Sequence, residues 1–557
     1  MNKILDNNYY DLIMGNTIIS GYGTGDNITP LSDRYSLLHI PITSPDPCDL
    51  GTYPYNSFPT LYALESEVSL DKSGIGSVQQ NSYLGLMGKG VLIGVVDTGI
   101  DYTHPAFQNP DGTSRIYSIW DQTIQEGTPP DSFTFGTEYS KEQLNEALLS
   151  SQPLSVVPST DNNGHGTAIA SIAAGSPSAD LSFSGVAPLS ELVIVKLKNA
   201  KNNLKNIFFV PEDTYCFQES DIYLGLRYLL SVAQKAARPI VICICLGSSL
   251  GGHDGNGAIS SFMTAKTQDP GICFVASAGN EGNNARHYLN ITSQIPWYHD
   301  FELKISEKDK EFCMVLWPYA TSRISIDIST PSRESTQRIY PTLNECRKFN
   351  FIFAQSIIWV NNILFDDETG NQVIVMRFKD PMPGVWYLRV QSMKEEPFSF
   401  HCWLPNGNFL SDETYFLNPD SSVTITSPGN GTHQLTVTAY NQFNDSVLTD
   451  ASRGYTTAGM IKPDISAPGF LLPCAVSGNS YGSATGTGTA AAHAAGAAAM
   501  IFEWGIVRKN LPTLTGYDIN RMFMRAARHG TANTYPNNLW GYGQLDVNKV
   551  FQQLTNL

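Results

Sequence analysis

A series of apolar runs, each ending in a polar turn, places the strongest constraint on the fold. The first, VLIGVVDTGID at residues 91–101, carries no charge before Asp97. Four further runs are similarly apolar, namely IYSIWD, LVIVKLK, PIVICICLG and GICFVASAGN. Parallel strands that are buried on both faces have this composition. Helix-like stretches separate the runs, including HGTAIASIAAG, SDIYLGLRYLLSVAQKAA and ISSFMTAKTQ. The alternation predicts an α/β fold with a doubly wound parallel sheet, whose site lies beyond the carboxyl ends of the strands.

A change of pattern divides the chain into parts. From Trp297 to Leu404 the helix signal disappears, and short strand-like segments follow one another at regular spacing, which is typical of a β-sandwich or jelly roll. The α/β pattern then resumes, so the β module is predicted to be inserted. At ~150 residues per domain, 557 residues suffice for several domains. We expect a small N-terminal unit with a thin core (1–65), a first α/β part (66–290), the inserted module (291–430) and a second α/β part (431–557).

The charge composition of the chain indicates which classes of binding partner to expect. Lys and Arg number 35 against 51 Asp and Glu, which gives a net charge of −16, and no basic cluster interrupts this balance. We therefore expect no nucleic acid and no membrane surface as a partner. No run approaches the ~20 apolar residues of a bilayer span, and the N-terminus lacks the apolar core of a secretory signal.

The cysteines and acidic residues predict no cofactor or metal. The nine cysteines are odd in number and scattered, so we expect buried free thiols in a reducing compartment. Cys243 and Cys245 are two residues apart, which is not the CxxC spacing of metal or redox sites. No segment has the spacing of an EF-hand loop, so calcium is unsupported.

Three polar residues follow apolar strands or open a helix. Asp97 stands in Asp-Thr-Gly at a strand end, His165 opens a helix in Asn-Gly-His-Gly-Thr, and Asn280 ends another strand in Ser-Ala-Gly-Asn-Glu-Gly. Taken singly, the Asp is equally well a turn residue and the His is ambiguous. An amide such as that of Asn280 can donate to a developing oxyanion. Together the three form a candidate catalytic group.

The motifs VVDTGID, NGHGTAIASIAAG, GVAP, SAGNEG, KPDISAPG and TGTGTAAAHAAG occur in this order between residues 88 and 503. In this order they resemble the subtilisin-like serine protease family. The resemblance implies that Asp97 is the orienting acid, His165 the general base and Asn280 the oxyanion-hole amide. It also matches Cys245, Leu246 and Gly247 to the strand that lines the substrate cleft, for which a simple buried strand is the alternative.

The nucleophile position departs from the family pattern. The family has Gly-Thr-Ser-x-Ala, and here the sequence is Gly486-Thr487-Gly488-Thr489-Ala490. Glycine has no nucleophilic atom, so no acyl-enzyme can form. In subtilisin itself, loss of the serine lowers turnover by about 10⁶. Thr487, Thr489 and Ser483 are not expected to place a hydroxyl beside His165. At a helix start the change costs only a few tenths of a kcal/mol, so the fold should survive.

Within the family, the segments SVQQNSYLGLMGKGVLIGVVDTGIDYTHPAF and SRGYTTAGMIKPDISAPG, the inserted module and the missing signal peptide resemble the Csp germination proteases of clostridial spores. In that group one member activates a cortex hydrolase, and others are pseudoproteases. The chain is most similar to the C-type pseudoprotease, which is implicated in sensing bile-salt and co-germinant signals; the A-type remains a rival.

The resemblance implies a location in the bacterial spore and no cofactor. The implied partners are a sister Csp protease, a cortex-hydrolase precursor and a small-molecule germinant. Subtilases remove their own propeptide, so with Gly488 the N-terminal unit should stay attached, its end near FPTLYALES filling the cleft. The alternative is an active or artificially inactivated protease that processes a cortex-hydrolase precursor.

Overall fold

The computed structural model describes residues 9–15, 19, 27–30, 35–41 and 72–555, apart from 82, 179–182, 201–204, 206–207, 218, 344, 367–369 and 532. The chain divides into two compact units, Met1–Glu65 and Ser66–Leu557. This division falls where the sequence pattern places the end of the N-terminal unit.

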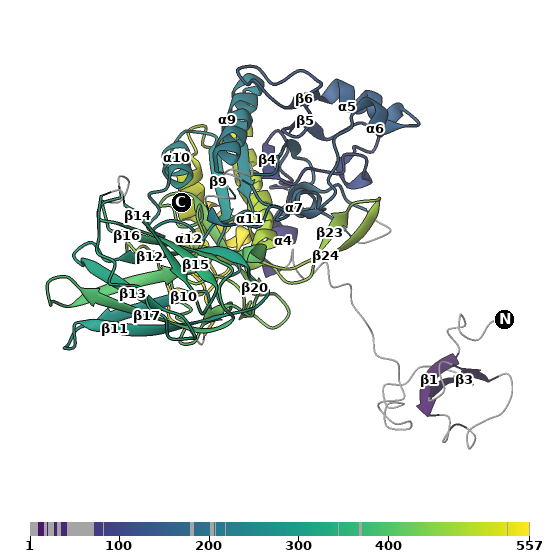
Figure 1. The fold of residues 1–557 in the computed structure, drawn as a ribbon. Helices are drawn as coiled ribbons and strands as arrows, with labels where there is room; N and C mark the ends of the chain where they lie inside the picture. The colour runs from purple at the N-terminus through teal and green to yellow at the C-terminus, as the bar shows by residue number, and fades with distance from the viewer. Residues whose placement is uncertain are drawn as a thin grey trace. The chain divides into compact units, whose positions relative to one another are not determined.

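The N-terminal unit contains a three-stranded antiparallel sheet in the order β1-β3-β2 (Figure 1). Its strands are β1 (Tyr9–Gly15), β2 (Ile28–Pro30) and β3 (Tyr35–Pro41). The apolar cluster consists of buried Met14, Ile19 and Leu38, with Ile28 and Ile40 packed against it. So small a core buries little apolar surface. The segment FPTLYALES, which was predicted to fill a cleft, lies outside the described residues.

A nine-stranded sheet forms the centre of the larger unit. Its order is β21-β20-β9-β8-β4-β7-β5-β6, with β22 paired to β20. Pairing is parallel from β5 through β7, β4, β8 and β9 to β20, and antiparallel where β6 and β21 join the edges. The five apolar runs supply β4, β5, β7, β8 and β9, which confirms the predicted parallel sheet. The bounds are β4 (Leu92–Asp97), β5 (Ile116–Asp121), β6 (Thr137–Ser140), β7 (Glu191–Lys196), β8 (Ile240–Ile244), β9 (Ile272–Ser277), β20 (Leu435–Asn441), β21 (Ser446–Val447) and β22 (Ile465–Pro468).

Helices cover both faces of this sheet (Figure 1). One apolar cluster contains α7 (His165–Ala174) and α11 (Thr487–Phe502), and the other contains α9 (Glu219–Ala236) and α10 (Ala258–Lys266). Strand β4 is buried throughout, with Ile93 and Val95 in the first cluster and Leu92 and Val96 in the second. Successive side chains of a strand point to opposite faces, so the apolar run is explained by burial on both.

Shorter elements complete the α/β part. The predicted capping box is present at α5, where Gln143 N donates to Ser140 Oγ and Ser140 N donates to Gln143 Oε1. The remaining elements are α4 (Ile75–Gln79), η3 (Pro105–Phe107), α5 (Lys141–Leu149), α6 (Pro153–Val156), β23 (Leu472–Val476), β24 (Ser480–Ala484), the π-helical turn η5 (Glu503–Val507), α12 (Gly516–Ala526) and α13 (Val547–Thr555).

One helical stretch, Thr487–Val507, has the length and apolar composition of a membrane span. It is also the central helix of the unit, and 83% of its apolar window is buried inside the protein. Its apolar character is therefore accounted for by the core.

The inserted module is a sandwich of two antiparallel sheets. One has the order β10-β18-β12-β16-β15-β14 and the other β13-β17-β11-β19. Side chains of both sheets share one apolar cluster, including Phe312 and Phe378 from the larger sheet and Trp386 and Leu388 from the smaller. Its strands occupy residues 287–416, against a predicted module of 291–430. They are β10 (His287–Thr292), β11 (Tyr298–Ile305), β12 (Glu311–Pro318), β13 (Ile324–Ser329), β14 (Cys346–Phe351), β15 (Ser356–Ile363), β16 (Val373–Lys379), β17 (Gly384–Ser392), β18 (Phe398–Trp403) and β19 (Tyr415–Phe416), with the 3₁₀ turn η4 (Gly407–Phe409) after β18.

The described cysteines are all free thiols, as the sequence predicts. Cys346 is exposed and Cys245 is partly exposed, whereas the others are buried, namely Cys216, Cys243, Cys273, Cys313, Cys402 and Cys474. Burial explains why most of them stand in strand-like runs, because a free thiol packs as a small apolar group.

A buried stack of rings lies on β10 and β18. Trp403 stacks on His287 and His401 with ring centroids 5.0 Å apart in each pair. His287 Nδ1 lies 3.0 Å from Asp420 O, His287 Nε2 lies 2.9 Å from His401 Nδ1, and His401 Nε2 lies 3.1 Å from the Tyr319 hydroxyl. Two neutral imidazoles satisfy this chain, one donor to each acceptor, whereas a second proton on His287 would set its Nε2–H against the Nδ1–H of His401.

Acid should therefore destabilise the sandwich. Burial lowers the pKa of His287 and of His401 to about 3, from about 6.5 in an unfolded chain. Below about pH 6.5 the unfolded state binds the extra protons, so stability should fall by up to about 1.4 kcal/mol per pH unit for each histidine down to about pH 3. Urea unfolding between pH 7.5 and 4.5 measures this slope. His401→Gln should lower the slope by the share of one histidine, whereas the exposed His529→Gln should leave it unchanged. Equal slopes in all three proteins would contradict the prediction.

Candidate active site

Asp97 and His165 form a hydrogen-bonded pair at the carboxyl end of β4. Asp97 is the last residue of β4 and fully buried, and His165 is the first residue of α7. The distance from His165 Nδ1 to Asp97 Oδ1 is 2.7 Å, and Thr98 N donates to the same oxygen. The charge of Asp97 is the largest influence on His165 and raises its pKa, although partial burial opposes this. The pair has the geometry of a base oriented by an acid.

Asp161, which the sequence analysis missed, fixes the turn that carries His165. Its carboxylate accepts four hydrogen bonds, from Thr98 Oγ1 and Gly164 N at 2.8 Å and from Thr167 N and Oγ1 at 2.9 and 2.7 Å. The N-cap residue of α7, Gly164, has no side chain and a φ of 86°, so Asp161 supplies the missing cap. The available signal was an acidic residue just before a helix start.

Asn280 lies beside the start of α11. Its Oδ1 accepts hydrogen bonds of 3.1 Å from both the backbone nitrogen and the hydroxyl of Thr487. The amide is thereby oriented, and Nδ2 has no hydrogen-bond partner within the described part of the chain. Because Asn280 lines a cavity that His165 and Gly488 also line, its Nδ2 is placed to donate to a bound oxygen.

Gly488 is the second residue of α11 and closes the same cavity. A Cβ added to it would lie 3.3 Å from Cys245 Cβ and 3.6 Å from Ile169 Cδ1. The backbone there has no positive φ, so a serine would fit after a shift of a few tenths of an ångström by Cys245. The position therefore retains nearly all the room that a nucleophile would need.

Neighbouring hydroxyl and thiol groups make other contacts. Thr487 Oγ1 bonds to Asn280, and Thr489 Oγ1 donates to Gly486 O at 2.7 Å. Cys245 Sγ donates to Gly488 O at 3.2 Å, and its contact with Cys243 together with burial raises its pKa well above the usual value. Among the described residues no hydroxyl or thiol hydrogen-bonds to His165, so the base has no activated nucleophile.

The cavity at this site has a volume of about 230 Å³. Cys245 and Gly247 of the predicted substrate strand line it together with His165, Asn280 and Gly488. Leu246 instead packs against the apolar cluster on the α9 side of the sheet, because successive side chains alternate. His493, on α11, is buried and hydrogen-bonded to Ser73, and burial lowers its pKa to about 3, which confirms the predicted packing role.

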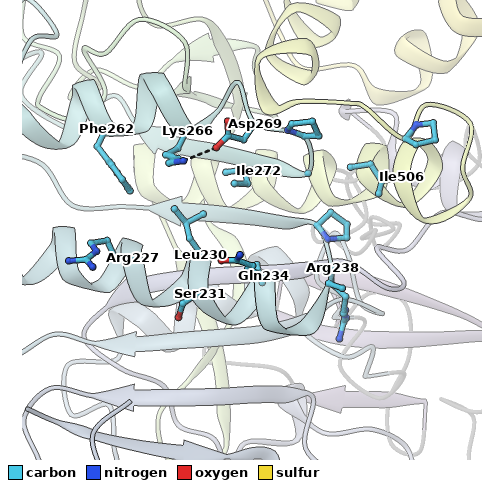
Figure 2. A pocket seen from close by; sticks show the side chains of 16 residues that line it. Arg227, Leu230, Ser231, Gln234, Arg238, Phe262, Lys266, Asp269, Ile272 and Ile506 are labelled. Carbon is cyan, nitrogen blue, oxygen red and sulfur yellow. Dashed lines mark hydrogen bonds and ion pairs between the residues drawn. The ribbon is translucent and has the colours of Figure 1, made fainter. Parts of the chain in front are cut away.

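A larger groove of about 700 Å³ lies away from these residues, between α9 and α10. In Figure 2, Arg227 and Leu230 of α9 face Phe262 and Lys266 of α10, and Lys266 pairs with Asp269 at 2.9 Å. None of Asp97, His165, Asn280 and Gly488 lines it. In the part of the chain that the structure describes, no group of three or more His, Cys, Asp or Glu side chains could hold a metal ion.

Comparison with known proteins identifies the family. The profile of the Subtilase family matches residues 88–298 and 394–543, which leaves out most of the sandwich. The chain belongs to the subtilase family. The solved structure of the Clostridium perfringens CspB protease is similar, with a TM-score of 0.77 and 29% identity, and the match covers 88% of this chain and 97% of that chain.

Two curated subtilases also match the chain over parts of their length. The minor extracellular protease Vpr of Bacillus subtilis (strain 168) is 20% identical over 541 residues, which are 89% of this chain and 57% of Vpr. The subtilisin-like protease SBT2.2 of Arabidopsis thaliana is 32% identical over 128 residues, 20% of this chain and 15% of that protein. The chain thus spans less than two thirds of the length of either relative.

The charge of Asp97 should govern the protonation of His165 in this subtilase. Asp97→Asn removes the negative charge that raises the His165 pKa, while burial continues to lower it, so the pKa should fall. NMR titration of the imidazole signals measures the change. Asp111→Asn, at an exposed turn bonded to Thr113, is the matched control and should leave His165 unchanged. An unaltered His165 titration in Asp97→Asn would show that the pair is not electrostatically coupled.

Proposed function

We propose that this subtilase is a pseudoprotease that binds in its cleft without cleaving. The observation that carries the proposal is Gly488 in an otherwise assembled site. Asp97 and His165 are hydrogen-bonded and Asn280 is oriented, yet the base has no hydroxyl to deprotonate. Without a nucleophile no acyl-enzyme forms, and the remaining groups can only bind.

The proposed setting is spore germination. Its support is the likeness to the Clostridium perfringens CspB protease over 88% of the chain, together with the Csp-like segments around Asp97 and Pro463. In this proposal the protein is of the C-type, lies in the spore, and controls an active sister protease that activates a cortex hydrolase. The cleft would hold a segment of the sister protease or of the hydrolase precursor, and a signal would shift the balance between bound and free states.

A serine at position 488 should restore self-cleavage. Gly488→Ser supplies the hydroxyl beside His165 in a position with room for it, so the chain should lose about 65 N-terminal residues, the length of the first compact unit. Intact-mass spectrometry compares it with the unmodified chain and with Gly488→Ala, which adds the Cβ without the hydroxyl.

Three outcomes separate the functions. Cleavage in the serine variant alone supports the pseudoprotease. Cleavage of the unmodified chain would overturn it and favour an active protease with an unexpected nucleophile. If the serine variant also processes a cortex-hydrolase precursor as fast as an active subtilase does, an artificially inactivated protease is the better interpretation.

The proposed signal is a small molecule such as a bile salt, and the groove between α9 and α10 supports it. Its 700 Å³ lies in the usual range for ligand sites, 300–1,000 Å³. Leu230, Phe262 and Ile272 give it an apolar wall, and Arg227 has no ion-pair partner among the described residues. A rigid apolar body with one carboxylate matches an apolar wall with a free cation at one end.

Charge reversal at the groove should weaken binding of cholate, the bile-salt probe. Arg227→Glu replaces attraction with repulsion, so the dissociation constant should rise about fivefold, or about 1 kcal/mol. Calorimetric titration measures it. Lys235→Glu, on the same helix but outside the groove lining, is the matched control and should bind as the unmodified chain does. Absence of saturable binding, or equal loss in both variants, would contradict this location for the signal.

A further inference from the structure

A side-chain amide from the inserted sandwich pairs with the predicted substrate strand. Asn406 follows β18 and directly precedes the turn η4. Its side chain does not cap that turn. Instead Nδ2 donates to Gly247 O at 2.8 Å, and Oδ1 accepts from Ser249 N at 2.9 Å. The amide therefore spans two residues of the segment that continues from Cys245.

This pairing is the one that a bound peptide would make. In an extended segment, residues two apart direct their N–H and C=O groups to the same edge. In a parallel pair, one residue of the neighbouring strand donates its N–H to one carbonyl and accepts at its own C=O from the amide two residues on, which is the pattern that Asn406 makes with Gly247 and Ser249. An added peptide strand binds a sheet edge through such bonds.

The other edge of the segment is also occupied. Ser248 N donates to Ser427 O at 3.0 Å, and Ser427 N donates to Ser248 O at 2.9 Å. The residues from Gly247 to Ser249 thus have backbone partners on both sides. A ligand strand that bonds to Gly247 O and Ser249 N must therefore displace Asn406.

Two buried charged residues hold Asn406 in place. The Arg286 guanidinium, 4% exposed, donates to the carbonyl oxygens of Pro405, Gly407 and Leu410 at 3.2, 2.7 and 2.8 Å. The Glu281 carboxylate, 7% exposed, accepts from Gly407 N at 2.9 Å. Charge-assisted bonds of this kind are about twice as strong as neutral ones, so the loop is preorganised.

We propose that Asn406 determines which ligands the cleft accepts, by occupying the backbone positions that an extended peptide needs. The inference rests on the proposed function, because it concerns entry to the same cleft. Asn406 and Gly407 line the 230 Å³ cavity together with His165, Asn280 and Gly488. A small group can enter the space beside residue 488 without touching Asn406, whereas a strand that pairs with Gly247 O and Ser249 N has to displace it.

The experiment uses the Gly488→Ser chain as a reporter. Hydrolysis of succinyl-Ala-Ala-Ala-Leu p-nitroanilide needs the extended edge, whereas acetyl-leucine p-nitrophenyl ester needs only the space beside residue 488. Adding Asn406→Ala should raise kcat/KM for the tetrapeptide about tenfold, through a lower KM, and leave the ester unchanged. The matched control is Asn510→Ala, because Asn510 also donates to a backbone carbonyl, Trp504 O at 2.8 Å, and does not line the cleft.

The outcomes distinguish the inference from the function on which it rests. Equal tetrapeptide kinetics with and without Asn406 overturns the inference and leaves the pseudoprotease proposal standing. Hydrolysis by the chain that keeps Gly488 overturns the pseudoprotease. If the serine reporter hydrolyses neither substrate, anisotropy with fluorescein-labelled succinyl-Ala-Ala-Ala-Leu is measured on the Gly488 chain, where Asn406→Ala should bind about tenfold more tightly. Equal or undetectable binding by both proteins then overturns the inference.

Discussion

The parallel pairing of β4 with β7 and β8 is the constraint on which the site depends. It places the buried carboxylate of Asp97 at the same edge of the sheet as the segment that follows β8 and the Asn280 turn that follows β9. Helices α7 and α11, on one face of this sheet, bring His165 and Gly488 to that edge. Residues from four distant parts of the chain meet because each follows a neighbouring strand or opens a helix packed beside it.

The strands and the motif residues were predictable because each depends on local sequence. Burial on both faces leaves an apolar run, and a functional side chain at a strand end leaves a polar residue after it. Asp161 was missed because its role depends on how a turn folds back onto Thr98. The contact of Asn406 with Gly247 joins residues 159 positions apart, across an insertion. Neither segment carries a sequence pattern that predicts contact with the other. The assignment of Leu246 to the cleft overlooked the alternation of side chains along a strand, which directs Leu246 to the opposite face of the sheet.

The retention of Asp97 and His165 beside Gly488 has a physical reason apart from catalysis. Asp97 is fully buried, and its Oδ2 has no hydrogen-bond partner in the described part of the chain. Its charge is stabilised mainly by His165 and the Thr98 amide. Removing His165 would leave a buried charge without its partner, which is strongly destabilising. Loss of the nucleophile carries no such penalty, so the hydroxyl can be lost while the pair remains.

Arg286 and Glu281 connect the inserted sandwich to the cleft. Arg286 stands just before β10, where the chain enters the sandwich, and it binds the loop between β18 and β19, the last two strands of the sandwich. The start of the sandwich and the loop before its last strand are thus both bonded to Glu281, the residue after Asn280. A recombination event that replaced this insertion with that of a relative would therefore also exchange a wall of the cleft. The module therefore cannot be exchanged without changing the cleft, because Asn406 and Gly407 of the module form part of the cleft wall.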